Sequence, residues 1–210
     1  MSTRYFTESI AKTFLSDRRA KVKKTVLTFG LIGGAIMAAM MFATLPFVDK
    51  IGFDKGEIVG YTTMILAFML VFFGIRSYRE NVSDGRITFG RAFAVGILIT
   101  VVSCVCYVIA WEILYFKFMP DFADKYGSYE VEKERAAGAS QQVIDAKLEQ
   151  MKSFKAMYDN PFINAAITFV EPFPIGLIVT LISAAFLRKK TIAATRDEGQ
   201  PAQLQVQSEN

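Results

Sequence analysis

Apolar and polar residues follow one another along this chain in long blocks. Residues 25–48, 58–75 and 92–111 contain no charged side chain, and residues 161–187 contain only one, Glu171. About 20 apolar residues in a helix are enough to cross a hydrocarbon core about 30 Å thick. The pattern therefore predicts an all-α polytopic membrane protein, a bundle of four transmembrane helices at about 25–48, 57–76, 91–116 and 161–188.

The segment between the third and fourth predicted spans, at about 118–160, has a helical pattern of its own. Residues 126–137 and 140–158 are predicted to form two helices that break at Gly138, with Ser140 as the N-cap of the second. Apolar residues recur at helical spacing along one face of the second helix. We expect an extracytoplasmic helical hairpin that either folds over the outer mouth of the bundle or lies flat on the outer leaflet.

The two ends of the chain are polar. Residues 1–24 are basic and form either a short interfacial helix or a flexible tail. Residues 191–210 lack apolar periodicity and are predicted to be a disordered tail. The chain therefore divides into a basic segment at 1–24, a membrane domain at 25–190 and a tail at 191–210.

The distribution of positive charge predicts the orientation in the membrane. Lysine and arginine are concentrated at 1–24, at 76–91 and directly after residue 187, whereas the loop between the first two spans has only Lys50 and Lys55 among three acidic residues. Loops rich in lysine and arginine stay in the cytoplasm. Both termini are therefore predicted to be cytoplasmic, in a multi-pass protein of the inner (cytoplasmic) membrane.

Composition excludes several kinds of chemistry. The chain has no histidine, which rules out Ser-His-Asp triads, Cys-His dyads and His-ligated metal sites. Cys104 and Cys106 would point about 200° apart on a helix. The net charge of +4 arises from basic residues beside apolar segments, where an anionic leaflet attracts them, so no nucleic-acid binding is expected. No nucleotide-binding loop is recognised, and we predict a non-enzymatic protein without cofactor or metal.

Glu171 is the first candidate for a binding residue, together with Pro172 and Pro174. It lies near the middle of the fourth span, where a carboxylate is costly unless it is protonated, paired or hydrated. The two prolines remove amide donors and should break the helix, which frees carbonyl groups beside the carboxylate. The group is either an ion site or a protonated acid that holds the kink. We predict that Glu171 is protonated at neutral pH, which the infrared band of its carboxyl group would test.

Glu112 is a second candidate, near the outer end of the third span between Trp111 and Tyr115. It either reaches the headgroups or lines an outward-facing cavity with Glu171, although their expected depths differ by about half a leaflet. No cation lies within the uncharged parts of the four spans, so Glu171 has no evident buried ion-pair partner. Neutral residues that could contact it are Tyr61, Thr62, Thr63, Thr100, Ser103, Thr168 and Thr180.

Two further patterns concern packing and charge. Gly30, Gly34 and Ala38 form a ridge of small residues, which serves either packing within the bundle or a homodimer. The arginines at 76–91, with Arg76 and Arg79 first, either only set the orientation or also bind anionic headgroups or a soluble partner.

Several ordered stretches resemble a known family of bacterial membrane proteins. They are KTVLTFGLIGG from Lys24, GEIVGYTTMILAF from Gly56, FFGIRSYR from Phe72, GRITFGRAF from Gly85, FMPDF from Phe118 and FPIGLIVTLISA from Phe173. Over about residues 22–190 the chain resembles the domain-of-unknown-function 4199 family, found mainly in the Bacteroidota. The resemblance implies a multi-span protein of the bacterial inner membrane and no reaction. Candidate residues within the matching stretches are Glu57, Arg76, Arg79, Pro120, Asp121 and Glu171.

Two functions fit these observations. The favoured one is a membrane scaffold or accessory subunit that binds a partner protein or lipid through its basic cytoplasmic face and its hairpin. The alternative is a small ion- or proton-coupled transporter or channel, monomeric or homo-oligomeric, with Glu171 as the intramembrane carboxylate.

Overall fold

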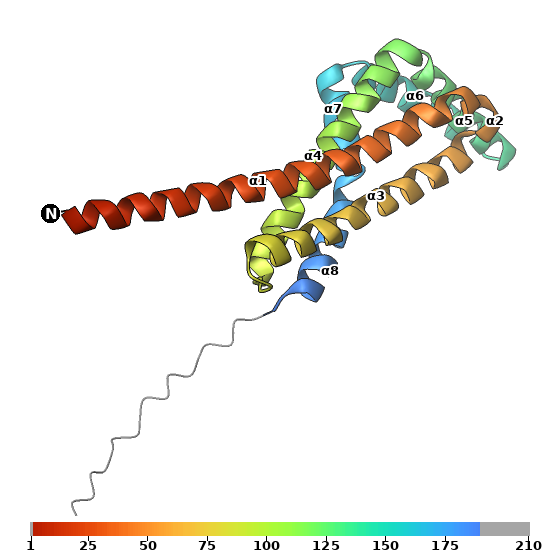
Figure 1. Ribbon diagram of the computed structural model, residues 1–210. Coiled ribbons are helices and arrows are strands. Elements are labelled where there is room, and N and C mark those ends of the chain that lie inside the picture. Colours follow the sequence, from red (N-terminus) through yellow and green to blue (C-terminus); the bar gives the residue numbers. More distant parts are fainter. Residues whose placement is uncertain (1, 190–210) are drawn as a thin grey trace, which may run out of the picture.

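The structure is a computed structural model that describes residues 2–189, with side chains from residue 16 onward except that of Asp49. Its elements are α1 (Ser2–Thr44), η1 (Leu45–Phe47), α2 (Val48–Ile51), α3 (Phe53–Val82), α4 (Phe89–Ile113), η2 (Leu114–Phe118), α5 (Phe122–Ala136), α6 (Gln141–Tyr158), α7 (Pro161–Val170) and α8 (Phe173–Leu187) (Figure 1). The tail predicted at 191–210 lies outside the described residues.

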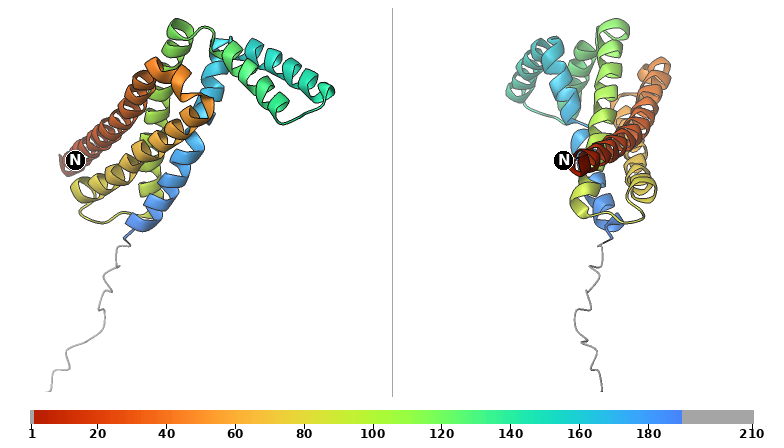
Figure 2. Two further views of the ribbon diagram at one scale, coloured as in Figure 1. Left: turned by 90° about the vertical axis from the view of Figure 1, so that its right-hand side faces the viewer. Right: turned by 60° about the vertical axis from the view of Figure 1, so that its left-hand side comes forward.

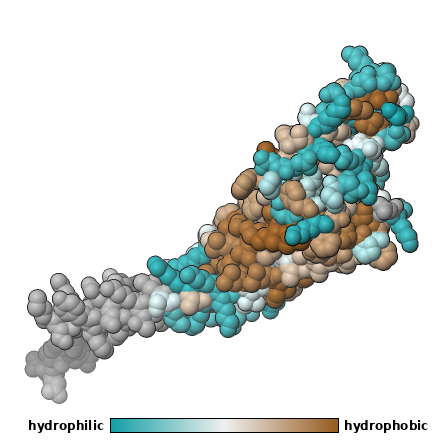
Figure 3. Space-filling view, turned by 90° about the horizontal axis from the view of Figure 1, so that it is seen from above, coloured by the Kyte–Doolittle hydropathy of each residue, from teal (hydrophilic) through white to brown (hydrophobic). Residues whose placement is uncertain are grey.

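The predicted all-α membrane fold is confirmed. Four helical segments are long and apolar enough to cross a membrane: Ser16–Phe47, Phe53–Val82, Phe89–Phe118 and Pro161–Leu187. Figure 3 shows apolar residues over the middle of the molecule, between hydrophilic residues at its two ends. Large apolar side chains such as Leu66, Ile109 and Phe186 are exposed on these helices. In a bilayer such side chains contact lipid chains, so their exposure is expected of a spanning helix.

The basic N-terminal segment differs from both sequence-based alternatives. Helix α1 runs without interruption from Ser2 to Thr44, so this segment and the first span form one helix rather than a separate short helix or a tail. The first turns of α1 extend past the loop that joins α3 to α4 (Figure 1). We call this end of the molecule the loop end and the opposite end, which carries α5 and α6, the hairpin end.

Helix α4 lies at the centre of the bundle and packs against α1, α3, α7 and α8. Its buried polar side chains bond to backbone or side chains of neighbouring helices. The Thr100 hydroxyl lies 3.1 Å from the Thr180 hydroxyl, and Ser103 Oγ donates to the Gly30 carbonyl at 3.0 Å. Each bond satisfies a polar group that has no water available in a lipid-surrounded core.

Glycine allows α1 to approach α4 closely. A Cβ atom built on Gly34 would lie 2.3 Å from Cys106 Cβ, and one built on Gly30 would lie 2.7 Å from Val102 Cβ. Such distances are too short for any real Cβ atom, so these positions accept only glycine. The Gly30 and Gly34 ridge therefore lies inside the bundle, and the third small residue of the ridge, Ala38, is half-buried.

Helices α5 and α6 form a hairpin, as the pattern at 118–160 predicts. The turn contains Gly138 with φ of 76°, a left-handed conformation that favours glycine. Ser140 is the N-cap of α6, but its side chain makes no capping hydrogen bond. The hairpin projects sideways from the end of the bundle (Figure 2).

Contacts near the start of α3 connect the hairpin to the bundle. The Phe53 ring lies 5.8 Å from Phe122, 5.5 Å from Tyr126 and 5.0 Å from Tyr129, measured between centroids. Beside them, Lys133 Nζ lies 3.4 Å from Asp54 Oδ1. The hairpin therefore packs on the protein at this corner as well as through its own connections to the spans.

Candidate functional site

The fourth span is interrupted at the position predicted from its prolines. Helix α7 ends at Val170 and α8 begins at Phe173, with Glu171 and Pro172 between them. Pro172 has no N–H to donate to the carbonyl of Thr168, and Pro174 has none for that of Val170. The carbonyls of Thr168 and Val170 therefore lack these helical hydrogen bonds beside the Glu171 carboxylate.

The Glu171 carboxylate has a hydrogen-bond donor on another span. The Tyr107 hydroxyl donates to Glu171 Oε2 at 3.0 Å, and Tyr107 itself is buried on α4. None of the seven neutral partners expected from the sequence makes a hydrogen bond with Glu171 in the described part of the chain. The sequence did not indicate Tyr107 as a partner of Glu171, because Tyr107 lies one turn before Trp111, in a region typical of interfacial aromatic residues.

Glu171 and Tyr107 face a cavity of about 760 Å³ at the hairpin end, which we call the hairpin cavity. Its walls come from α1, α3 and α4, and residues of α5 and α6 close it from the side of the hairpin. The lining includes apolar and aromatic side chains: Met37, Met41, Met64, Tyr61, Trp111, Phe122, Tyr126 and Tyr158. A space of this size and composition matches the sites that hold small molecules.

Acidic side chains outnumber basic ones around the hairpin cavity. Asp54, Glu57, Glu130 and Glu171 line it together with Lys125 and Lys133. Asp54 pairs with Lys133, and Glu130 pairs with Lys147 at 2.6 Å. Within residues 16–189, no lysine or arginine lies within ion-pair distance of Glu57 or Glu171. Neither carboxyl group therefore has a basic side chain as partner, so Glu171 in its ionised form would carry an uncompensated negative charge.

The ion pairs at the hairpin also affect the lysines that form them. Hydrogen bonding to Asp54 raises the pKa of Lys133, and hydrogen bonding to Glu130 raises that of Lys147. Both lysines therefore stay charged at neutral pH and remain bound to their carboxylates. Each lysine neutralises its own partner carboxylate, so neither of them compensates a charge on Glu171.

The structure brings only some of the sequence candidates together. Glu57 and Glu171 share the hairpin cavity. Glu112 does not line it, and within the described part of the chain Glu112 Oε1 is buried without a hydrogen-bond partner. Asp121 is exposed on the hairpin side, where a hydrogen bond from Lys125 holds the pKa of its carboxyl below the usual range.

Arg76 and Arg79 lie at the loop end, far along α3 from the cavity. Arg76 Nε pairs with Glu80 at 2.9 Å, and both side chains are about half exposed. Arg79 is largely buried, and its Nη1 atom donates to the Leu187 carbonyl at 3.5 Å. Arg79 therefore caps the C-terminus of α8, where a cation also interacts favourably with the helix dipole.

Comparison with known proteins supplies a family but no activity. A family model described as "Protein of unknown function (DUF4199)" matches residues 28–189. No curated protein and no solved structure matches the chain. The match covers α3 to α8 and most of the first span, including every residue named above for the hairpin cavity. The chain therefore belongs to the DUF4199 family of proteins of unknown function.

Proposed function

We propose that this protein is a non-enzymatic membrane protein that binds a small organic cation in the hairpin cavity, as a step in its transport. The observation that carries the proposal is Glu171. It lies at the interruption of the fourth span, faces the cavity, and has Tyr107 as donor but no cation as partner among the described side chains. Interrupted spans with a charged group at the break are a recurring feature of transporter binding sites.

The lining of the hairpin cavity favours an organic cation over a neutral or anionic ligand. Glu57 attracts positive charge, and Glu171 does so when a cation replaces the proton that we predict it carries at neutral pH. The rings of Trp111, Tyr126 and Tyr158 line the same space and offer cation–π contacts. Methionine side chains on α1 and α3 adapt their shape to different ligands. An anionic ligand would meet repulsion from Glu57 and would have no means of displacing the proton of Glu171.

A titration that uses the fluorescence of Trp111 tests the proposal. This residue is the only tryptophan of the chain and lines the cavity, so its emission reports on occupancy. Benzyltrimethylammonium should change the emission saturably, whereas neopentylbenzene, its neutral isostere, should bind about tenfold more weakly. In Glu171→Gln the preference for the cation should fall markedly, and the part that remains comes from Glu57 and the aromatic rings. Equal binding of the two probes to the unmodified protein would refute the proposal.

Gly60→Leu provides a variant that fills the cavity without disturbing the fold. Gly60 lines the cavity, and a Cβ atom built on it meets no other atom within 4 Å. The substitution should abolish probe binding by occupying the space, while the unfolding temperature stays the same or rises because leucine favours helix. Unchanged probe affinity in Gly60→Leu would place the probe outside the cavity.

Transport is measured separately from binding. Proteoliposomes that contain the protein should take up radiolabelled tetraethylammonium, and Glu171→Gln should abolish this uptake while leaving insertion and folding intact. Saturable binding without uptake would limit the function to ligand binding. Uptake that is equal in Glu171→Gln would exclude the carboxylate from the transport site.

A second function is supported by the loop end of the molecule. Arg18, Arg86 and Arg91 gather there, which favours a scaffold or accessory subunit that attaches to a partner protein or to lipid at its basic face. We infer that this face is cytoplasmic and that the protein resides in the bacterial inner membrane with both termini in the cytoplasm. Purification in mild detergent tests this second function: a partner that copurifies should be lost when Arg86 and Arg91 are both replaced by glutamine, and retained in Glu171→Gln.

A further inference from the structure

A second hollow lies at the loop end, remote from the hairpin cavity. It has a volume of about 440 Å³ and is lined by Arg18, Ser83, Asp84, Arg86 and Arg91. These residues come from α1, from the α3–α4 loop and from the first turn of α4. Segments distant in the sequence therefore place three arginines around one space.

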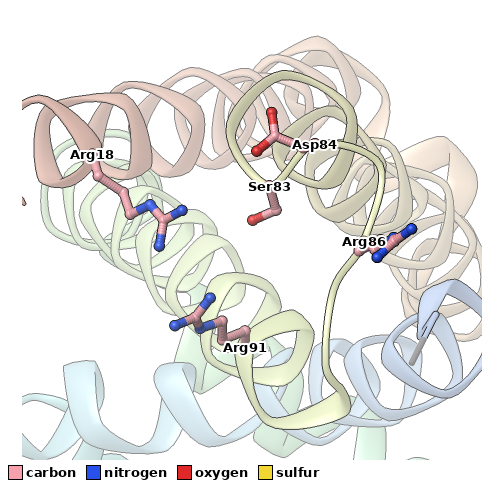
Figure 4. Close-up of a pocket in the computed structure, with 5 residues that line it drawn as sticks. All are labelled: Arg18, Ser83, Asp84, Arg86 and Arg91. Carbon is pink, nitrogen blue, oxygen red and sulfur yellow. The ribbon is translucent and has the colours of Figure 1, made fainter. Parts of the chain in front are cut away.

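Figure 4 shows how these side chains are directed. The guanidinium groups of Arg18 and Arg91 and the hydroxyl of Ser83 point towards the same space, whereas Arg86 points away from it. Asp84 lies at the edge of the hollow. The space thus presents two guanidinium groups and one hydroxyl, which are donors suited to a phosphate group.

The donors around this hollow lack protein acceptors. Within residues 16–189, no ion pair joins Arg18, Arg86 or Arg91 to a carboxylate, and the nearby Glu80 is occupied by Arg76 and Arg79. Ser83 Oγ is buried and has no hydrogen-bond partner among the described residues. A buried hydroxyl without a partner costs free energy, and a ligand that accepts its hydrogen bond recovers it.

The position of Arg18 along α1 indicates the depth of the hollow relative to the membrane. The uncharged part of the first span begins at Thr25, and Arg18 precedes it by about 10 Å of helix at 1.5 Å per residue. The headgroup region occupies the several ångströms beyond the hydrocarbon core. The Arg18 backbone therefore lies at about the outer edge of the headgroup region, from which its long side chain can reach a lipid phosphate or a soluble one.

From this geometry we propose that Arg18, Arg91 and Ser83 form a binding site for one phosphate group. The ligand is either the headgroup of an anionic phospholipid or a water-soluble phosphate ester. Arg18 and Arg91 neutralise the charge, and the hydroxyl of Ser83 donates to a third oxygen. The α4 N-terminus, to which Arg91 belongs, adds the positive end of the helix dipole. This site is independent of the function proposed for the hairpin cavity.

Calorimetric titration of the full chain in a maltoside detergent tests the site with two probes. Dihexanoyl phosphatidylglycerol represents the lipid and glycerol 1-phosphate the soluble ester. Saturable binding of at least one probe is expected. Tighter binding of the lipid by tenfold or more identifies a lipid headgroup site, and comparable or tighter binding of glycerol 1-phosphate identifies a soluble ligand. Failure of both probes to bind would overturn the proposal.

Matched variants distinguish a defined site from a basic surface. Arg18→Gln and Arg91→Gln should each weaken binding about tenfold, as expected for a charge-assisted hydrogen bond, and Ser83→Ala about threefold. Arg86→Gln removes the same charge from a side chain that points away from the hollow. The affinity of this variant for the probe should stay within twofold of that of the unmodified protein. An equal loss in Arg86→Gln and Arg91→Gln would refute the site. Arg91→Lys retains the positive charge but lacks the planar guanidinium group, so it should bind the probe with intermediate affinity. This result would show that the weaker binding of the glutamine variants does not come from misfolding.

Discussion

At the scale of single residues, the hydrogen bond between Tyr107 and Glu171 joins the third span to the fourth. Tyr107 lies on a continuous helix, whereas Glu171 lies at an interruption. The continuous helix therefore fixes the donor, and the donor orients a carboxylate whose own backbone is irregular. Ligand recognition at Glu171 should depend on this bond as well as on charge.

Tyr107→Phe should leave the bundle folded but alter the Glu171 carboxyl group. The band of this group in the infrared spectrum is identified by its loss in Glu171→Gln, and it should shift in Tyr107→Phe because one hydrogen bond is missing. The affinity for benzyltrimethylammonium should fall about fivefold, the usual effect of one such bond. A spectrum identical to that of the unmodified protein would show that the bond does not form.

Gly34 provides a second test at this scale. Gly34→Leu places side-chain atoms where Cys106 already lies, since even a Cβ atom would be 2.3 Å away. We expect a loss of stability of about 1–3 kcal/mol, or failure to fold, as overpacking of a core produces. Thermal unfolding in detergent measures the effect, and Gly60→Leu is the control because it adds the same atoms in open space. Equal stability of the two variants would contradict the packing of α1 on α4.

At the scale of elements, the connection between the hairpin and the fourth span is specified by one capping residue. Asn160 Oδ1 accepts hydrogen bonds from the N–H groups of Phe162 at 3.0 Å and Ile163 at 3.4 Å. Pro161 occupies the first position of α7, where its missing N–H has no consequence. Just before this cap, Tyr115 of η2 donates to Asp159 at 2.7 Å. The start of α7 is therefore fixed relative to both α6 and the end of the third span.

Asn160→Ala should destabilise the protein by about 1 kcal/mol, because two amide groups at the start of α7 lose their acceptor. Asn160→Ser retains a capping oxygen, so its stability should be close to that of the unmodified protein. Hydrogen exchange of the first turn of α7 should speed up in the alanine variant only. Identical exchange in both variants would mean that water replaces the cap at no cost.

At the scale of the whole molecule, polar functions are separated between its two ends. The hairpin cavity carries unpaired carboxylates, whereas the hollow at the loop end carries unpaired arginines. The four spans between them are packed around α4, whose central residues Ile99, Thr100 and Cys104 are fully buried. The two sites therefore lie at opposite ends of the four candidate spans.

Labelling with a membrane-impermeant maleimide tests this arrangement. Gln142→Cys on the hairpin and Asn81→Cys near the loop end are both at exposed positions. In intact cells only one of them should react, and the other should react after permeabilisation, because they lie at opposite ends of the spans. The native cysteines contribute little signal, since Cys104 is buried and Cys106 half-buried within the third span. Reaction of both variants in intact cells would contradict the four-span topology.

The sequence alone determined the class of fold, the number of spans, the hairpin between the third and fourth, and the interruption beside Glu171. These features depend on local properties: the length of uncharged segments, helical periodicity, glycine at a turn and proline within a helix. Only the tertiary structure decided what Glu171 contacts, that Glu57 shares its cavity while Glu112 does not, and that Arg18 joins the α3–α4 loop. These features depend on how helices rotate and cross, which side-chain packing sets between residues far apart in the chain and which no local pattern specifies.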